Sequence, residues 1–345
     1  MLPRDRVFAA LEFRKPDVVP VEYHPSPAGL YEHRERLREL WRRHAQDFGD
    51  DFRGAPIPQP EPGSVDANGK YHTFRKDIWG VLWEYHIFGV AGHPVQRPLD
   101  DWAGLKRFRP PPSPRAAGKD FRREQVQARE HQEKHFLKSG WVSVFEVLRA
   151  VRRFEDVLMD IEADEPRIHR LADTIVEYQL QVIAQLLKRG VDAVQLGDDF
   201  GTQQGLMLSP RTWRRFFRPR YQRLMEPIHK AGKKVFFHSC GNVAGLLDEI
   251  AELGAAAIWP QLPLYDEREL AARLRALKLA VALQPDRSHL MTFGTPDEVR
   301  AAVARTAETF RVADGGAWFY VEIDNGFPFA NVRALIESVA ELRER

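Results

Sequence analysis

The sequence predicts an α/β protein built as a (β/α)8 TIM barrel, with a loop and hairpin segment inserted after the first βα units. The second half of the chain alternates strand-like apolar runs with amphipathic helical stretches, which favours parallel strand pairing. With two strands in the first part of the chain, the strand count reaches eight. A chain of 345 residues can form one such barrel, since barrels of about 250 residues or more are common. We therefore expect a single domain over residues 1–345.

The expected strands are short apolar runs, and helical stretches separate most of them. The first helical stretch runs from about Gly29 to His44, where apolar residues recur at helical spacing. The predicted strands are Val18–Tyr23, Asp47–Phe52, Trp141–Val147, Ala193–Leu196, Lys234–Cys240, Ala256–Pro260, Leu279–Leu283 and Ala317–Ile323.

Three later helices carry clear start signals. Each has a capping or acidic residue directly before a proline, which is tolerated in the first helical turn. This pattern predicts helices over Glu165–Arg189, Pro210–Ala231 and Pro296–Ala313.

The segment from about residue 54 to residue 136 interrupts the alternation. It begins with a proline-rich, turn-forming stretch at 55–63, and Trp79–Gly89 has the pattern of a β-hairpin. A long irregular segment inside a compact domain is often a lid or a binding loop, although its aromatic residues could also pack it onto the barrel. We expect a lid or a surface that docks a partner.

The composition excludes some classes of partner. A net charge of +2 gives no electrostatic reason to expect nucleic acid or an anionic membrane as the main partner. No apolar run approaches the roughly 20 residues that cross a bilayer, and the first residues are too charged for a secretion signal. We expect a cytoplasmic protein acting on a small molecule. The oligomeric state stays open, with a homodimer as one option.

Polar residues gather where the predicted strands end. In a (β/α)8 barrel the carboxyl ends of the strands form the active face, so side chains there point to function. Any single one of them could instead be a helix cap or a rim charge. The residues are His24, Glu146, Asp198, Asp199, His238, Cys240, Gln261, Gln284, Asp286, Glu322 and Asp324.

The run His238-Ser239-Cys240-Gly241 is the most informative of these. On an extended segment, His238 and Cys240 point to the same side. Cys240 is the only cysteine, which excludes an intramolecular disulfide and a four-cysteine metal site. Packing, a reactive thiol and a mixed-ligand metal site remain as alternatives.

With these motifs, the chain resembles the uroporphyrinogen decarboxylase superfamily, which includes zinc-dependent methyltransferases that work with corrinoid proteins. The resemblance implies the same barrel fold. The segments that carry it are Lys76–Gly80, Gly197–Gln203, Leu208–Pro210, Val235–Val243, Gly294–Val299 and Pro328–Val332.

Departures from the family pattern favour the methyltransferase branch. True uroporphyrinogen decarboxylases have an early Arg-Gln-Ala-Gly-Arg signature whose arginines receive the substrate's carboxylates, whereas residues 21–26 here contain no arginine. The decarboxylases also have a Gly-His-Gly near the last strand, which residues 321–326 lack. One feature is retained, because Asp198 or Asp199 matches the aspartate that faces the pyrrole nitrogens in the decarboxylases.

The methyltransferase branch binds zinc through a His-x-Cys pair and a later cysteine. His238 and Cys240 match the pair, but the later cysteine is absent. By position, the resemblance implies that Glu322 replaces it, with Asp324 as the second candidate. Three protein ligands and one open position are typical of catalytic zinc.

The resemblance also suggests roles for the other residues. Asp198, Asp199 and Glu146 are candidates for proton handling or for orienting the metal ligands. His24, Trp83, Gln261 and Asp324 are candidates for the walls of the substrate pocket.

The leading hypothesis is methyl transfer between a small substrate, such as a methyl ether, and a corrinoid (cobalamin) presented by a partner protein, with Zn²⁺ as cofactor. A metal-free decarboxylase acting on a porphyrinogen-like or other carboxylated substrate is the alternative. A barrel that only binds a cofactor or partner is a third possibility.

Overall fold

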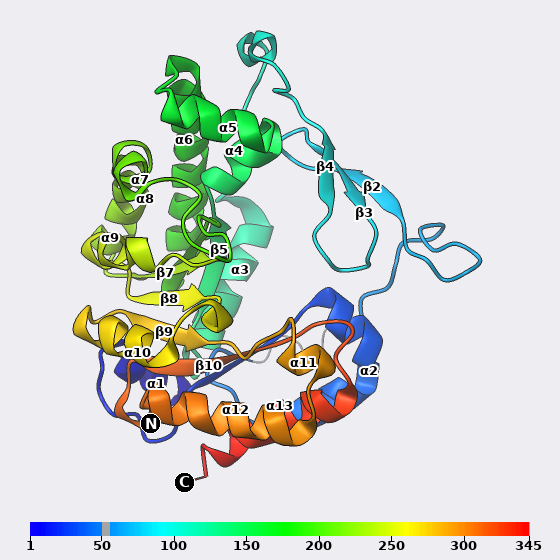
Figure 1. The fold of residues 1–345 in the computed structure, drawn as a ribbon, viewed down its shortest axis with the longest axis vertical. Helices are drawn as coiled ribbons and strands as arrows, with labels where there is room; N and C mark the ends of the chain where they lie inside the picture. The colour runs from blue at the N-terminus through cyan, green and yellow to red at the C-terminus, as the bar shows by residue number, and fades with distance from the viewer. Residues whose placement is uncertain (50–55, 345) are drawn as a thin grey trace.

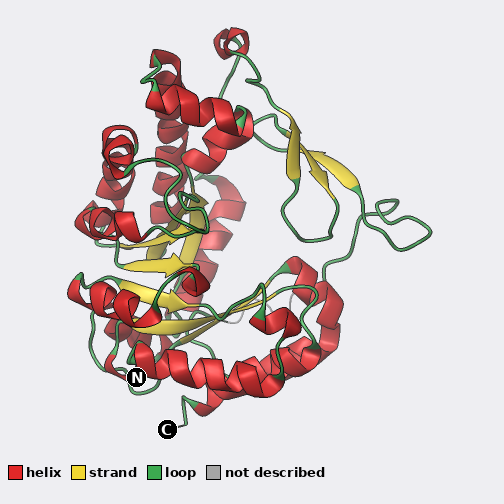
Figure 2. Ribbon diagram, viewed as in Figure 1, coloured by secondary structure: helices red, strands yellow, loops and turns green. Residues whose placement is uncertain are grey.

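The computed structural model describes residues 1–49 and 56–344. Its centre is a curled parallel sheet of seven strands with helices on its outer side, a TIM-barrel-like α/β arrangement (Figures 1 and 2). The strands are ordered β1-β10-β9-β8-β7-β6-β5. Their bounds are β1 Val21–Pro25, β5 Lys138–Val142, β6 Ala193–Gly197, β7 Lys234–Ser239, β8 Ala257–Pro260, β9 Ala280–Leu283 and β10 Ala317–Ile323.

The helices lie mainly between successive strands in the chain. Their bounds are α1 Pro3–Leu11, α2 Pro27–Arg42, α3 Gly118–Gln132, α4 Phe145–Val151, α5 Phe154–Glu162, α6 Pro166–Arg189, α7 Pro210–Phe216, α8 Arg218–Lys230, α9 Leu247–Glu252, α10 Glu267–Ala276, α11 Leu290–Phe293, α12 Pro296–Thr309 and α13 Phe329–Glu341. In the described parts of the chain, no helix combines the length and apolar character needed to span a membrane.

The helix-start signals are confirmed. The side chains of Glu165, Ser209 and Thr295 each accept a hydrogen bond from a backbone N–H in the first turn of α6, α7 and α12. The expected long helix from Pro210 was wrong in one respect, because it is divided into α7 and α8 at Phe217.

Five of the strand predictions agree with β6 to β10 to within a residue or two at each end, and β1 begins three residues later than expected. The strand predicted over Trp141–Val147 was misplaced, since β5 ends at Val142 and α4 begins at Phe145. The cause lies outside the segment. The Asp198 carboxylate accepts hydrogen bonds from the backbone N–H groups of Val144 and Glu146, both at 2.7 Å, and so stabilises the start of a helix.

The predicted second strand is not present in its described part, because Asp47–Gly49 is irregular; residues 50–52 lie outside the described residues. The segment nevertheless lies beside β1. Asp47 N–H donates to Val21 O at 2.9 Å, and Asp47 O accepts from Phe136 N–H at 3.0 Å. In a closed barrel an eighth strand would lie between β1 and β5, the two ends of the sheet. Here an irregular segment takes that place and joins β1 to the residues that lead into β5.

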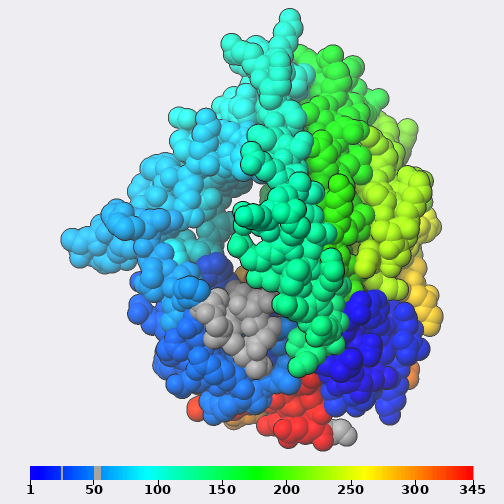
Figure 3. Space-filling view, turned by 180° about the vertical axis from the view of Figure 1, so that it is seen from behind, coloured from blue at the N-terminus to red at the C-terminus, as the bar shows by residue number. Residues whose placement is uncertain are grey.

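A separate three-stranded antiparallel sheet follows α2 in the chain, with strands β2 Thr73–Lys76, β3 Leu82–Tyr85 and β4 His93–Gln96. It stands on the side to which the carboxyl ends of the barrel strands point (Figure 1). The predicted hairpin is present but displaced, because its turn lies at Asp77–Gly80, where Asp77 accepts from the backbone N–H groups of Trp79 and Val81. From behind, the molecule is hollowed between this sheet and α3 (Figure 3).

Among the described residues, large aromatic rings fill one end of the interior of the curled sheet. Phe136, Phe236 and Trp318 pack on one another there, with ring centroids 5.8 Å and 5.2 Å apart in successive pairs. Small residues at Ala257 and Ala280 on neighbouring strands leave room for these large rings. The carboxyl ends of the strands are left open, and the polar side chains gather there.

Candidate metal and active site

Three potential metal ligands converge at the carboxyl ends of β6 and β7. Gly197 is paired with His238 in the sheet, so Asp199 lies beside Cys240. Cys240 N–H donates to Asp199 Oδ1 at 2.9 Å, and Cys240 Sγ lies 3.3 Å from His238 Nε2. His238 Nε2 is 3.6 Å from Asp199 Oδ1. One ligand atom from each side chain lies within 4.8 Å of the other two, which is close enough for a shared ion.

The imidazole of His238 is oriented for ligation. Its Nδ1 lies 2.9 Å from the backbone carbonyl of Trp259, and a carbonyl can only accept, so Nδ1 carries the proton. Nε2 therefore presents its lone pair to Asp199 and Cys240. A backbone carbonyl that holds the second nitrogen of a histidine is a common feature of metal sites.

Burial lowers the pKa of His238 to about 4, so the ring is neutral at pH 7. Burial, followed by the nearby Asp199 charge, raises the pKa of the Cys240 thiol to about 12. The donor set is a neutral imidazole, a thiol and a carboxylate, and zinc accepts nitrogen, sulfur and oxygen ligands of these types. A divalent cation also displaces the thiol proton, so the residues present fit zinc.

Glu322, the predicted third ligand, is not part of this cluster. Its carboxylate accepts from Gln284 Nε2 at 2.7 Å and pairs with Arg287 Nη1 at 2.9 Å. Asp324, the second candidate, also pairs with Arg287. Arg287 pairs with both acids, and the carboxylate beside the His-Cys pair is Asp199.

Asp198 and Asp199 have different environments. Asp198 is fully buried, and besides its two bonds to the start of α4 it accepts from the hydroxyl of Tyr221. Burial raises the pKa of Asp198 to about 7. Both of its carboxylate oxygens are engaged by these hydrogen bonds inside the protein, so its position fits a structural role rather than the predicted catalytic one.

Glu146 supports Asp199 from α4. Its carboxylate accepts from Asp199 N–H at 3.3 Å and pairs with Arg149 at 2.5 Å, and Arg149 lies 3.8 Å from the Asp199 carboxylate. Burial raises the pKa of Glu146. Sequence reasoning missed Arg149, although its position three residues after Glu146 on a helix could have indicated the ion pair.

The cluster opens into a cavity of about 840 Å³ at the mouth of the barrel. His238 and Cys240 line this mouth cavity, as do three of the residues predicted for the substrate pocket, His24, Gln261 and Asp324. Trp83, also predicted there, does not line this cavity. Its indole N–H donates at 2.8 Å to Asp77, in the turn between β2 and β3.

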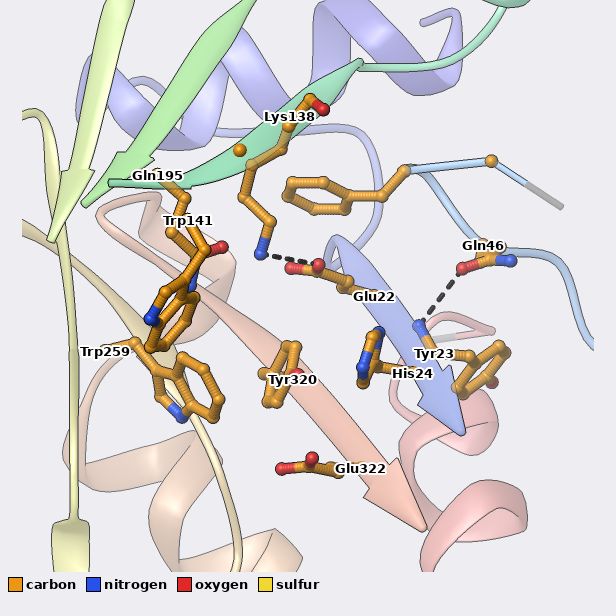
Figure 4. Close-up of a pocket in the computed structure, with 14 residues that line it drawn as sticks. Glu22, Tyr23, His24, Gln46, Lys138, Trp141, Gln195, Trp259, Tyr320 and Glu322 are labelled. Carbon is orange, nitrogen blue, oxygen red and sulfur yellow. Dashed lines mark hydrogen bonds and ion pairs between the residues drawn. The ribbon is translucent and has the colours of Figure 1, made fainter. Parts of the chain in front are cut away.

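A second cavity of about 480 Å³ lies inside the barrel and shares His24, Trp259 and Glu322 with the mouth cavity (Figure 4). Trp141, Trp259 and Tyr320 form much of its wall. Lys138 and Glu22 make a 2.7 Å ion pair across it, and both side chains are largely buried. The sequence analysis missed Lys138 because it placed the start of this strand at Trp141.

Residues 103–342 match the family model described as uroporphyrinogen decarboxylase (URO-D). The chain belongs to this family. The match begins after the three-stranded sheet and covers β5 to β10, and so includes Asp199, His238 and Cys240.

Curated relatives in the URO-D family are distant. The uroporphyrinogen decarboxylase of Xanthomonas campestris pv. campestris (strain B100) is 26% identical over 157 residues, 44% of this chain and 41% of that protein. The Thermus thermophilus enzyme of the same name is 24% identical over 196 residues, 55% of this chain and 53% of that protein. The chain therefore spans about half the length of the curated relatives it matches.

One solved structure matches this protein over almost its whole length. A methyltransferase from Methanosarcina mazei superposes with a TM-score of 0.64 over 99% of both chains, at 14% sequence identity. At this identity, the likeness shows a shared fold.

Proposed function

We propose that this URO-D family protein is a zinc-dependent methyltransferase that moves a methyl group between a small substrate and a corrinoid carried by a partner protein. The convergence of Asp199, His238 and Cys240 at the barrel mouth carries this proposal. Three protein ligands leave a fourth position for a substrate heteroatom. Bound there, zinc would supply Lewis acidity to the heteroatom that gains or loses the methyl group.

The protein's own groups prepare the site. The Trp259 carbonyl fixes the ring of His238, while Arg149 and the Cys240 N–H hold the Asp199 carboxylate. The ring centroids of Trp141 and Trp259 lie 5.4 Å and 4.0 Å from that of His238. These two indoles limit the access of water to the imidazole. The mouth cavity leaves room for the substrate and for approach of the methyl carrier.

The experiment is to measure zinc in two matched carboxylate variants. Asp199→Asn should lose about one zinc per chain relative to the wild type, because it removes a charged ligand, whereas Glu322→Gln should retain it. Cobalt(II) substitution gives a second readout, since a thiolate–cobalt absorption band should be present in the wild type and absent in Cys240→Ser. Unchanged zinc in Asp199→Asn, together with no thiolate band in the wild type, would overturn the proposal.

A metal-free decarboxylase is the second candidate, and the names of the curated relatives favour it. Asp199 keeps 27% of its side chain exposed and could stabilise positive charge on a substrate ring nitrogen. Against it, residues 21–26 on and after β1 contain no arginine, unlike the decarboxylase signature, and Arg287 at the mouth is paired with two carboxylates. Turnover of a porphyrinogen by zinc-free protein would favour this candidate over methyl transfer.

A further inference from the structure

The three-stranded sheet carries a second group of potential metal ligands, His72, Glu84 and His86. In the β2–β3 pair, Thr73 lies opposite Tyr85 and Phe74 opposite Glu84, so the same register places His72 opposite His86. Because side chains alternate along strands, His72, Glu84 and His86 emerge on one face of the sheet. None of these residues belongs to the site at the barrel mouth.

The three side chains are close together. His72 Nε2 lies 2.8 Å from Glu84 Oε1, and His86 Nε2 lies 3.6 Å from the same oxygen. The two imidazole rings are stacked, with centroids 5.1 Å apart and planes inclined by 8°. Both Nε2 atoms therefore approach one carboxylate oxygen from adjacent, parallel rings. In a tetrahedral zinc site with bonds of about 2.0–2.1 Å, neighbouring ligand atoms are about 3.3 Å apart, a spacing that small side-chain rotations would reach here.

We propose that His72, Glu84 and His86 form a second zinc site, outside the barrel. Two neutral imidazoles and one carboxylate form a three-ligand set that zinc accepts, with a position left for water. Glu84 lies on β3, while His72 directly precedes β2 and His86 directly follows β3, so the ion would link the open end of the β2–β3 hairpin. The site does not depend on the proposed methyl transfer, because it shares no residue with the mouth cluster.

The position of this second site connects it to the barrel mouth. His86 is the first residue of the loop between β3 and β4, and Ile87, Gly89 and Val90 of that loop line the mouth cavity. The Phe88 ring packs edge-on against Tyr31 of α2, at 5.1 Å. An ion at His86 would hold the base of the loop and restrict its motion over the cavity.

Equilibrium dialysis against zinc chloride at micromolar free zinc tests the proposal. The full-length His238→Ala/Cys240→Ala variant, which lacks the mouth ligands, should still bind about one zinc per chain. Adding His72→Ala and His86→Ala should abolish this binding, whereas adding His289→Ala, an exposed histidine outside the cluster, should not. Zinc should also slow amide hydrogen exchange over residues 86–92.

Absence of zinc from the His238→Ala/Cys240→Ala variant, or equal binding with and without His72 and His86, would overturn the second site. If the mouth variant does not fold, the same comparison is made in the wild type with cobalt(II). His72→Ala/His86→Ala should then lose one metal equivalent and keep the thiolate–cobalt band. An unchanged number of bound metal equivalents in this variant, or loss of the thiolate–cobalt band, would contradict the proposal.

Discussion

At the residue scale, two adjacent aspartates have opposite surroundings. Asp198 is fully buried and accepts hydrogen bonds from α4 and Tyr221, whereas Asp199 is partly exposed and accepts from the backbone N–H of Cys240. The sequence placed both at the end of a strand, where alternation puts neighbouring side chains on opposite sides. It could not tell which side is the mouth, since that depends on the partner strands.

Replacing Asp198 by alanine should destabilise the fold. The change leaves two buried backbone N–H groups and the Tyr221 hydroxyl without their acceptor, which costs about 3 kcal/mol or more. Urea unfolding would show this as a lower midpoint. Tyr221→Phe, which removes only one of these hydrogen bonds, should cost about 1 kcal/mol. A midpoint unchanged in Asp198→Ala would contradict the structural role.

At the element scale, the proximity of His238 and Cys240 was predictable because they lie two residues apart at the end of one extended segment. The carboxylate beside them was not, because Asp199 reaches them through the pairing of β6 with β7, and Arg287, from the loop after β9, pairs with Glu322. The misplaced β5 has the same origin. Its apolar run is compatible with either strand or helix, and a carboxylate from β6 determines where the helix begins.

The loop after β7 requires glycine at position 241. Gly241 has φ +79°, and a Cβ there would collide with the backbone of Gly201. Gly241→Ala should therefore cost about 2 kcal/mol or more and displace Cys240, with loss of zinc. Gly205→Ala is the matched control, because its Cβ would meet open space without positive φ. Equal thermal stability of the two variants would show that this close approach is not needed.

The stability of the packing between α2 and α13 should depend on pH. His33 is buried against Phe329, and neither ring nitrogen has a hydrogen-bond partner in the described structure. Burial lowers the pKa of His33, so the unfolded chain binds its proton more tightly. The stability that depends on a neutral His33 ring is fully present above about pH 6.5. It is lost as the pH falls, because protonation of His33 then favours unfolding. His33→Leu should have a flatter profile of melting temperature between pH 7 and pH 5; an unchanged slope would contradict this.

At the scale of the whole molecule, the repeated strand–helix alternation was enough to predict the TIM-barrel-like sheet, and β6 to β10 confirm it. The irregular segment beside β1 was beyond sequence reasoning, because its stability comes from distant residues. Asp47 is fully buried and is bound by Arg6 of α1 and by Arg343, which follows α13. Such a convergence leaves no local pattern in the sequence.

Asp47→Ala should therefore destabilise the entire fold. It removes the shared partner of two largely buried guanidinium groups, and breaking buried ion pairs typically costs about 3–5 kcal/mol. Asp17→Ala is the control, because Asp17 also pairs with Arg6 but keeps 37% of its side chain exposed, and it should cost about 1 kcal/mol or less. Similar urea midpoints for the two variants would contradict this account of the junction.

We propose that Asp199, His238 and Cys240 hold one metal ion at the barrel mouth. An anomalous difference map from crystals grown with zinc, recorded at the zinc absorption edge, would locate this ion. We expect a peak about 2.0–2.3 Å from His238 Nε2, Cys240 Sγ and an Asp199 carboxylate oxygen. A zinc-loaded crystal with no peak among these three atoms, or with Glu322 as the carboxylate ligand, would contradict it.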